Sequence, residues 1–129
     1  MVIVDSNVWI HWLRTPDTAI GRELGRLLDE EQVAMVGVVL AEVLQGARGQ
    51  VEFDRLHSLL EVLPFLETSK DTWVRAGALS LQLRIEGKLT PLTDLVIAAL
   101  ALEGGHQVYS LDEHFQRVPG LRLYEAKAG

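Results

Sequence analysis

Two acidic residues directly follow apolar segments that are typical of short strands. Asp5 closes the run Val2–Val4, and Asp112 comes just after a segment that ends at Ser110. In an open parallel sheet, ligands bind at the edge formed by the carboxyl ends of the strands. We therefore expect Asp5 and Asp112 at that edge.

Two further acids lie in strongly apolar segments that are typical of buried helices. Glu42 interrupts the run 38–44, and Asp94 opens the run 95–102. A carboxylate against a hydrophobic core costs free energy unless it is paired or binds a cation. No lysine or arginine stands alongside these acids, and carboxylate oxygens are the ligands that Mg²⁺ and Mn²⁺ prefer. The four acids together predict one divalent-cation site.

Each acid also has a structural explanation when it is considered alone. Asp5 is suited to cap the helix that follows it, and Asp94 to cap or charge the first turn of its helix. Asp112 fits a turn, and Glu42 could pair with Arg48. Taken singly, these structural roles are favoured. The set of four favours convergence on one cation.

The elements that must position these acids alternate between strands and helices. Short apolar runs predict strands near 2–4, 33–36, 62–66, 107–110 and 121–124. Helical periodicity predicts helices near 8–13, 20–28, 39–46, 51–60, 69–87 and 93–102. This alternation predicts an α/β fold with a parallel sheet and helices on both faces.

Length and composition favour one ordinary globular domain. The chain has 129 residues, 48% of them hydrophobic and 23% charged, and no cysteine. The absence of cysteine excludes disulfides, thiolate zinc sites and a cysteine nucleophile. A net charge of −6 argues against a nucleic-acid partner, but a bound divalent cation reverses the sign of the local field.

The beginning of the chain gives an expectation about location. Asp5 stands near the start with no basic residue before it, unlike a secretory signal. The longest nearly uncharged run, 33–41, is far shorter than the roughly 20 residues that a bilayer crossing needs. We therefore expect a cytoplasmic protein without membrane contact.

Four segments, taken in order, resemble the motifs of PIN-domain nucleases. The segments are Ile3-Val4-Asp5-Ser6-Asn7-Val8, Leu40-Ala41-Glu42-Val43-Leu44-Gln45-Gly46, Pro91-Leu92-Thr93-Asp94 and Ser110-Leu111-Asp112-Glu113-His114-Phe115. Length and spacing match over essentially the whole chain, and the small form is similar to VapC-type toxins of bacterial toxin–antitoxin pairs. The resemblance implies a three-layer α/β/α domain over 1–129, with a central mostly parallel sheet.

The resemblance also implies a Mg²⁺- or Mn²⁺-dependent endoribonuclease that leaves 5′-phosphate and 3′-hydroxyl ends. Asp5, Glu42, Asp94 and Asp112 take the family's acidic, metal-binding positions. Asn7 and Ser110 match polar positions that support those acids. His114 stands where the family often has a second acid, which argues against a complete second metal site.

Partners follow from the same resemblance. The substrate is expected to be RNA, and a small antitoxin is expected to block the acidic site. A homodimer is expected by analogy. The pair Trp9 and Trp12, spaced to share one helix face, is expected in the core or along a groove for a partner.

Other chemistries fit less well. A haloacid-dehalogenase-type phosphatase needs a second acid two residues after the first, where Asn7 stands. A receiver-type signalling domain needs a lysine after a late strand, and none follows Ser110. The histidines lack zinc-motif spacing, and for His114 a surface or hydrogen-bonding role is favoured over contact with a phosphate. A non-catalytic α/β interaction domain stays open as an alternative.

Overall fold

A parallel sheet forms the centre of the computed structural model, which describes residues 1–126. The strand order is β3-β2-β1-β4-β5, and all four neighbouring pairs are parallel. The strands are β1 (Val2–Val4), β2 (Val33–Val36), β3 (Phe65–Leu66), β4 (Gln107–Tyr109) and β5 (Arg122–Leu123). From β1 the chain continues to β2 on one side, and the later strand β4 pairs on the other. The gap between the ends of β1 and β4 is therefore a topological switch point, where open parallel sheets bind ligands.

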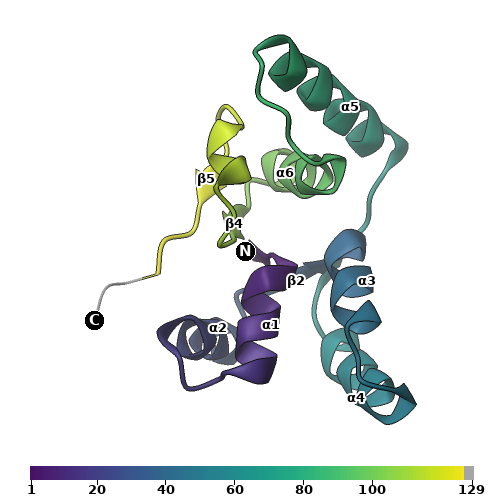
Figure 1. Ribbon diagram of the computed structural model, residues 1–129, viewed down its shortest axis with the longest axis vertical. Coiled ribbons are helices and arrows are strands. Elements are labelled where there is room, and N and C mark those ends of the chain that lie inside the picture. The colour runs from purple at the N-terminus through teal and green to yellow at the C-terminus, as the bar shows by residue number, and fades with distance from the viewer. Residues whose placement is uncertain (127–129) are drawn as a thin grey trace.

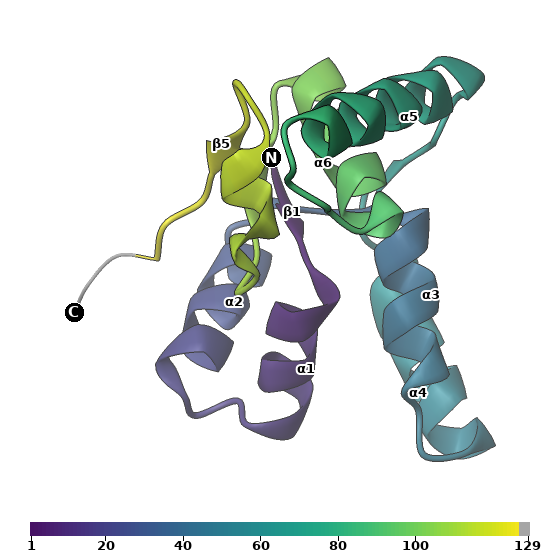
Figure 2. The ribbon, with the colours of Figure 1, turned by 45° about the horizontal axis from the view of Figure 1, so that its top comes forward.

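Helices cover both faces of this sheet. They are α1 (Ser6–Arg14), α2 (Ala19–Asp29), α3 (Gly37–Gln45), α4 (Gln50–Glu61), α5 (Lys70–Ile85) and α6 (Leu92–Gly104), and a 3₁₀ helix, η1, spans Glu113–Arg117. Helices α1 and α2 lie on one side of the strands and α5 and α6 on the other (Figures 1 and 2). Helix α3 contacts both α1 and α6. The expected three-layer α/β/α arrangement is confirmed.

Burial explains why the apolar runs became these elements. All residues of β1 and β2 are buried, as expected for strands covered on both faces. Helix α6 is buried continuously from Leu95 to Ala101, which accounts for its lack of a polar face. At its end, Gly105 adopts a left-handed conformation with φ of 67° and turns the chain towards β4.

The two edge strands are shorter than the sequence predicts. The expected strand 62–66 is reduced to Phe65–Leu66, because Val62 caps α4 and the Leu63 N–H bonds to the Leu60 carbonyl. The expected strand 121–124 is reduced to Arg122–Leu123. The helix predicted from Ser69 is confirmed, with Ser69 and Thr72 forming a capping box. Within residues 1–126 no helix has both the length and the apolar character to span a membrane.

Candidate active site

Asp5 joins the end of β1 to the start of α1. It is the N-cap residue of α1, and its Oδ1 accepts a 2.8 Å hydrogen bond from the Ser6 N–H. Its Oδ2 accepts a 2.7 Å hydrogen bond from the Ser110 hydroxyl, and the residue is only 5% exposed. Asp5 therefore caps α1 and also lies at the carboxyl edge of the sheet, so both of the roles that we expect for it are compatible.

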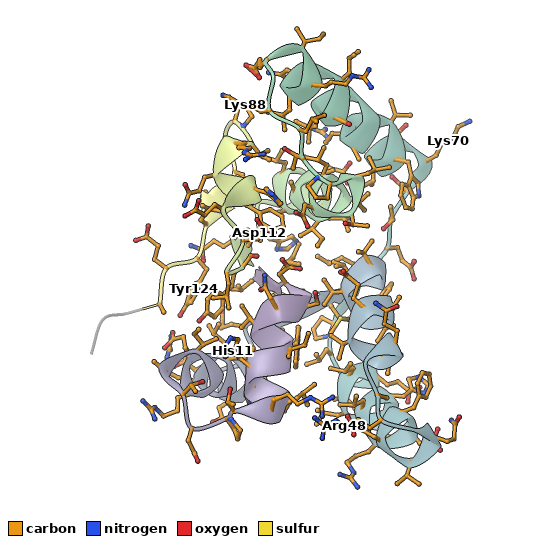
Figure 3. All side chains as sticks on the ribbon, viewed as in Figure 1. His11, Arg48, Lys70, Lys88, Asp112 and Tyr124 are labelled. Carbon is orange, nitrogen blue, oxygen red and sulfur yellow. The ribbon has the colours of Figure 1, made fainter. Side chains whose placement is uncertain are left out.

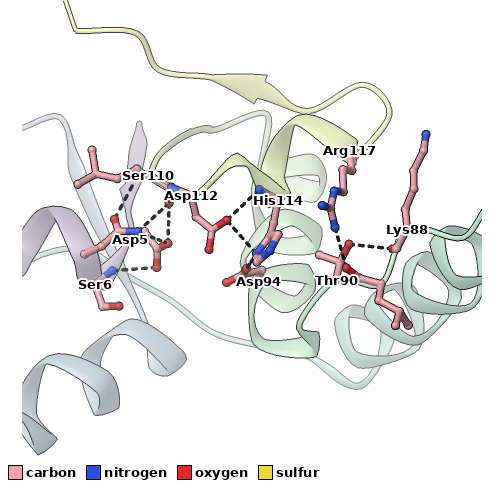
Figure 4. A network of polar contacts seen from close by, with 12 residues as sticks. Asp5, Ser6, Lys88, Thr90, Asp94, Ser110, Asp112, His114 and Arg117 are labelled. Carbon is pink, nitrogen blue, oxygen red and sulfur yellow. Dashed lines mark hydrogen bonds and ion pairs between the residues drawn. The ribbon is translucent and has the colours of Figure 1, made fainter.

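Ser110 and Asn7 connect the ends of β1 and β4. The Ser110 Oγ accepts hydrogen bonds from the Asn7 side-chain amide at 3.3 Å and from the Asp112 N–H at 3.0 Å. The Asn7 Oδ1 in turn accepts a bond from the Leu111 N–H at 3.2 Å. These contacts fix the Asp5 carboxylate and the chain that leads to Asp112 relative to each other (Figure 4).

Asp94 and Asp112 meet through the imidazole ring of His114. Asp94 lies in the first turn of α6, and Asp112 is the N-cap residue of η1. The His114 Nδ1 is 3.0 Å from Asp94 Oδ2 and 2.8 Å from Asp112 Oδ1. Asp112 Oδ1 also accepts the His114 backbone N–H at 2.9 Å. One potential ligand atom from each of these three residues lies within 4.8 Å of the others.

Glu42, on α3, completes the set of four acids. It is partly buried, and within residues 1–126 it forms no hydrogen bond or ion pair. Burial raises the pKa of Glu42, and the negative charges of Asp5 and Asp94 raise it further. Burial also raises the pKa of Asp94; the His114 hydrogen bond opposes this, while Asp5 and Asp112 add to it.

The four acids therefore share one electrostatic neighbourhood, but they are not equally close. Asp94 and Asp112 belong to the group with ligand spacing, whereas Asp5 and Glu42 lie outside that group. No lysine or arginine of the described chain pairs with any of the four, as the sequence predicts. The alternative pairing of Glu42 with Arg48 is not formed, and Arg48 lies far from Asp112 (Figure 3).

This donor set fits a divalent cation. It offers carboxylate oxygens and one imidazole nitrogen, which are common ligands of hard and borderline metal ions. Burial is the largest cause of the raised pKa values of Glu42 and Asp94, and repulsion from the neighbouring acids raises them further, while His114 opposes the rise at Asp94. A cation bound here would relieve that repulsion.

His114 is the one member of the cluster that the sequence did not single out as a site residue. The expected hydrogen-bonding role is confirmed, but its partners are two of the candidate acids. The signal in the sequence is its position in the fourth of the motifs that resemble those of PIN-domain nucleases, where the resemblance leads us to expect an acid. In the pair Trp9 and Trp12, Trp9 is buried and Trp12 packs edge-on against it, with ring centroids 5.7 Å apart.

Comparison with known proteins decides the family. The PIN domain model matches residues 2–121, which is nearly the whole chain. The chain belongs to the PIN-domain family. Ribonuclease VapC11 of Mycobacterium tuberculosis is 29% identical to this PIN domain, over 98% of the chain and 97% of the relative.

Solved structures share the fold of this PIN domain. A toxin-antitoxin complex from Klebsiella pneumoniae matches with a TM-score of 0.74 and 22% identity, over 94% of this chain and 95% of that one. VapBC2 from Rickettsia felis, bound to a DNA fragment from its promoter, matches with a TM-score of 0.76 and 22% identity, over 96% and 98%. Membership of the PIN-domain family argues against both the phosphatase and the receiver-domain alternatives.

Proposed function

We propose that this PIN domain is a VapC-type endoribonuclease that hydrolyses RNA phosphodiester bonds with Mg²⁺ or Mn²⁺. The observation that carries the proposal is the gathering of Asp5, Glu42, Asp94 and Asp112 at the sheet's switch point without a lysine or arginine partner. The full-length similarity to Ribonuclease VapC11 supports the substrate class. The 129 residues act as a single nuclease domain.

In this proposal all four acids hold the catalytic metal. Asp94 and Asp112 have ligand spacing, and Asp5 and Glu42 contribute through direct contact or through water. When bound, a divalent cation supplies positive charge at the scissile phosphate and acidifies the attacking water. No protein nucleophile is required, and the products carry 5′-phosphate and 3′-hydroxyl ends.

Ser110 and Asn7 position these acids. The Ser110 hydroxyl donates to Asp5 and accepts from the Asp112 backbone, so it holds the two acidic segments at a fixed separation. Asn7 supports Ser110 through its amide. Groups that orient metal ligands in this way typically change metal affinity or activity by about 10–100-fold when they are removed.

The partners are proposed on the same basis. The likeness to a toxin-antitoxin complex supports a small antitoxin that covers the acidic site. We propose that the protein is a homodimer and that it acts in the cytoplasm. Light scattering of the purified chain, alone and with the product of a neighbouring small gene, tests both assemblies.

The decisive test is RNA cleavage by the wild type and by Asp94→Asn, with Mg²⁺, Mn²⁺ or a chelator. Asp71→Asn is the matched control, because Asp71 also lies in the first turn of a helix but is exposed and does not belong to the cluster. We expect cleavage by the wild type and Asp71→Asn only with metal, and none by Asp94→Asn. A folded wild type that cleaves no RNA with either ion, yet binds an antitoxin, would instead support the non-catalytic alternative.

A further inference from the structure

The imidazole of His114 lies between two carboxylates of the proposed metal site, at a position from which its ring nitrogen could bind the cation. Its Nδ1 lies 3.0 Å from Asp94 Oδ2 and 2.8 Å from Asp112 Oδ1 (Figure 4). Ligands at right angles around an octahedral cation, each about 2.1 Å from it, are about 3.0 Å apart. The His114 nitrogen therefore already has the spacing of a neighbouring ligand to each of the two carboxylate oxygens, and the three donor atoms lie within 4.8 Å of one another.

The local structure holds this ring in place from both ends of η1. Asp112 caps the helix and accepts the His114 N–H, which fixes the backbone that carries the ring. Phe115, the next residue, is 1% exposed and anchors η1 in the core. At the other end, the Arg117 guanidinium donates a 2.7 Å bond to the Leu89 carbonyl in the loop between α5 and α6. Because the ring is held in this way, it needs no large movement to act as a ligand.

Nitrogen and oxygen donors select different ions. Mg²⁺ strongly favours oxygen ligands and dehydrates reluctantly, whereas an imidazole nitrogen suits first-row transition metals. An all-carboxylate site leaves the choice between Mg²⁺ and Mn²⁺ to ion availability. A site with two carboxylates and one imidazole at ligand spacing discriminates against Mg²⁺.

We infer that His114 Nδ1 is a direct ligand of the catalytic cation and that it makes this site selective for Mn²⁺, or a similar transition metal, over Mg²⁺. This inference rests on the proposed metal-dependent function and adds the identity of the ion class. An acid at the same position would supply an oxygen ligand and would not give this preference for Mn²⁺.

A competing explanation uses the same distances. Separations of 2.8 and 3.0 Å are also those of hydrogen bonds, so the imidazole could act only as a proton donor to Asp94 and Asp112. In that case a metal ion must displace the ring. Removal of His114 would then strengthen the binding of both ions, which is the opposite of what a ligand role predicts.

The test is the affinity for Mn²⁺ and Mg²⁺, each measured by calorimetric titration of the purified, metal-free protein. The variants are His114→Ala, which removes the nitrogen, and His114→Asp, which gives an all-oxygen set. His57→Ala is the matched control, because His57 is exposed on α4 and far from the cluster in sequence. Circular dichroism confirms that each variant is folded.

We expect His114→Ala to weaken Mn²⁺ binding by about tenfold or more while changing Mg²⁺ binding much less. His114→Asp should bind Mg²⁺ more tightly than the wild type does and lose the preference for Mn²⁺. The His57→Ala variant should retain both wild-type affinities. An unchanged ratio of Mn²⁺ to Mg²⁺ affinity in His114→Ala, or tighter binding of both ions, overturns the inference.

A spectroscopic measurement on the wild type removes any dependence on the folding of variants. Electron spin-echo spectra of bound Mn²⁺ should show coupling to a nitrogen nucleus, and this signal should vanish in His114→Ala. A bound Mn²⁺ without nitrogen coupling contradicts the ligand role and leaves the proposed nuclease function intact. If the wild type binds neither ion, both this inference and the proposed metal dependence fail.

Discussion

Substitution of Asp5 separates the structural role of its carboxylate from its proposed catalytic role. The side chain caps α1 through the Ser6 N–H and accepts the Ser110 hydroxyl bond. Asparagine keeps an oxygen that can cap the helix, and it ranks with aspartate as an N-cap residue. Alanine removes both the cap and the acceptor. Both substitutions remove the negative charge.

The expected losses of stability differ accordingly. For Asp5→Ala, the lost cap costs about 1 kcal/mol and the lost hydrogen bond to a charged group about 2 kcal/mol. Together these predict a decrease of about 3 kcal/mol in the free energy of unfolding without metal. Asp5→Asn keeps the cap, but an amide nitrogen replaces the oxygen that accepts the Ser110 hydroxyl, so this hydrogen bond is lost in both variants. Both variants also reduce the repulsion that contributes to the raised pKa values of Glu42 and Asp94, so we expect Asp5→Asn to be about 1 kcal/mol more stable than Asp5→Ala, which is the contribution of the cap.

The assay combines urea unfolding in chelator with RNA cleavage in Mn²⁺. Both Asp5 variants should lose cleavage, and Asp5→Asn should be the more stable of the two. Thr18→Ala is the control, because Thr18 caps α2 away from the cluster and should cost about 1 kcal/mol with full activity. Wild-type cleavage by a folded Asp5→Asn would refute the catalytic role. Equal destabilisation by the two substitutions would refute the capping argument.

Three further predictions follow from the contacts of single residues. Burial and two neighbouring acids raise the pKa of Glu42 in the folded protein above its value in the unfolded chain. As pH rises through this interval, the unfolded chain loses the proton first, so the contribution of Glu42 to the free energy of unfolding falls. The stability of Glu42→Gln relative to the wild type, from urea midpoints in chelator, should therefore increase between about pH 4 and pH 7; a difference independent of pH contradicts this cause. Gly21→Ala places a Cβ 2.8 Å from backbone atoms of Thr15 and Pro16 and should lower the free energy of unfolding by about 1–3 kcal/mol. Gly77→Ala meets open space and should stabilise α5 by up to about 1 kcal/mol. Similar urea midpoints for the two variants would contradict the difference in packing at the two positions. Ser110→Ala should lower stability by about 1–3 kcal/mol and RNA cleavage by about tenfold or more, while the exposed Ser58→Ala changes neither.

The central strands could be predicted because the pattern that identifies them lies entirely within short segments of the sequence. The runs Val2–Val4 and Val33–Val36 are apolar throughout, which is typical of strands buried on both faces. The edges carry a weaker signal. The apolar run 62–66 predicts one strand, but Val62 is the C-cap residue of α4 and only Phe65–Leu66 form β3. The strand order depends on pairing between distant segments, which local patterns do not encode.

The site was predictable to a similar extent. Asp5 and Asp112 could be placed because parallel strands bring their carboxyl ends to one edge, and Glu42 and Asp94 because carboxylates do not suit apolar helices. His114 could not be assigned in this way. Its role depends on a 3₁₀ turn that brings its ring to Asp94, which lies 20 residues earlier in the chain. Only the structure shows that contact.

The most direct measurement is the Mn²⁺ affinity of four single variants, Asp5→Asn, Glu42→Gln, Asp94→Asn and Asp112→Asn, beside the wild type and Asp71→Asn. If the four acids serve one cation site, every one of the four substitutions weakens the same binding event, and Asp71→Asn leaves it unchanged. Wild-type Mn²⁺ affinity in all four folded variants would show that these carboxylates do not form a shared metal site and would contradict the proposed function.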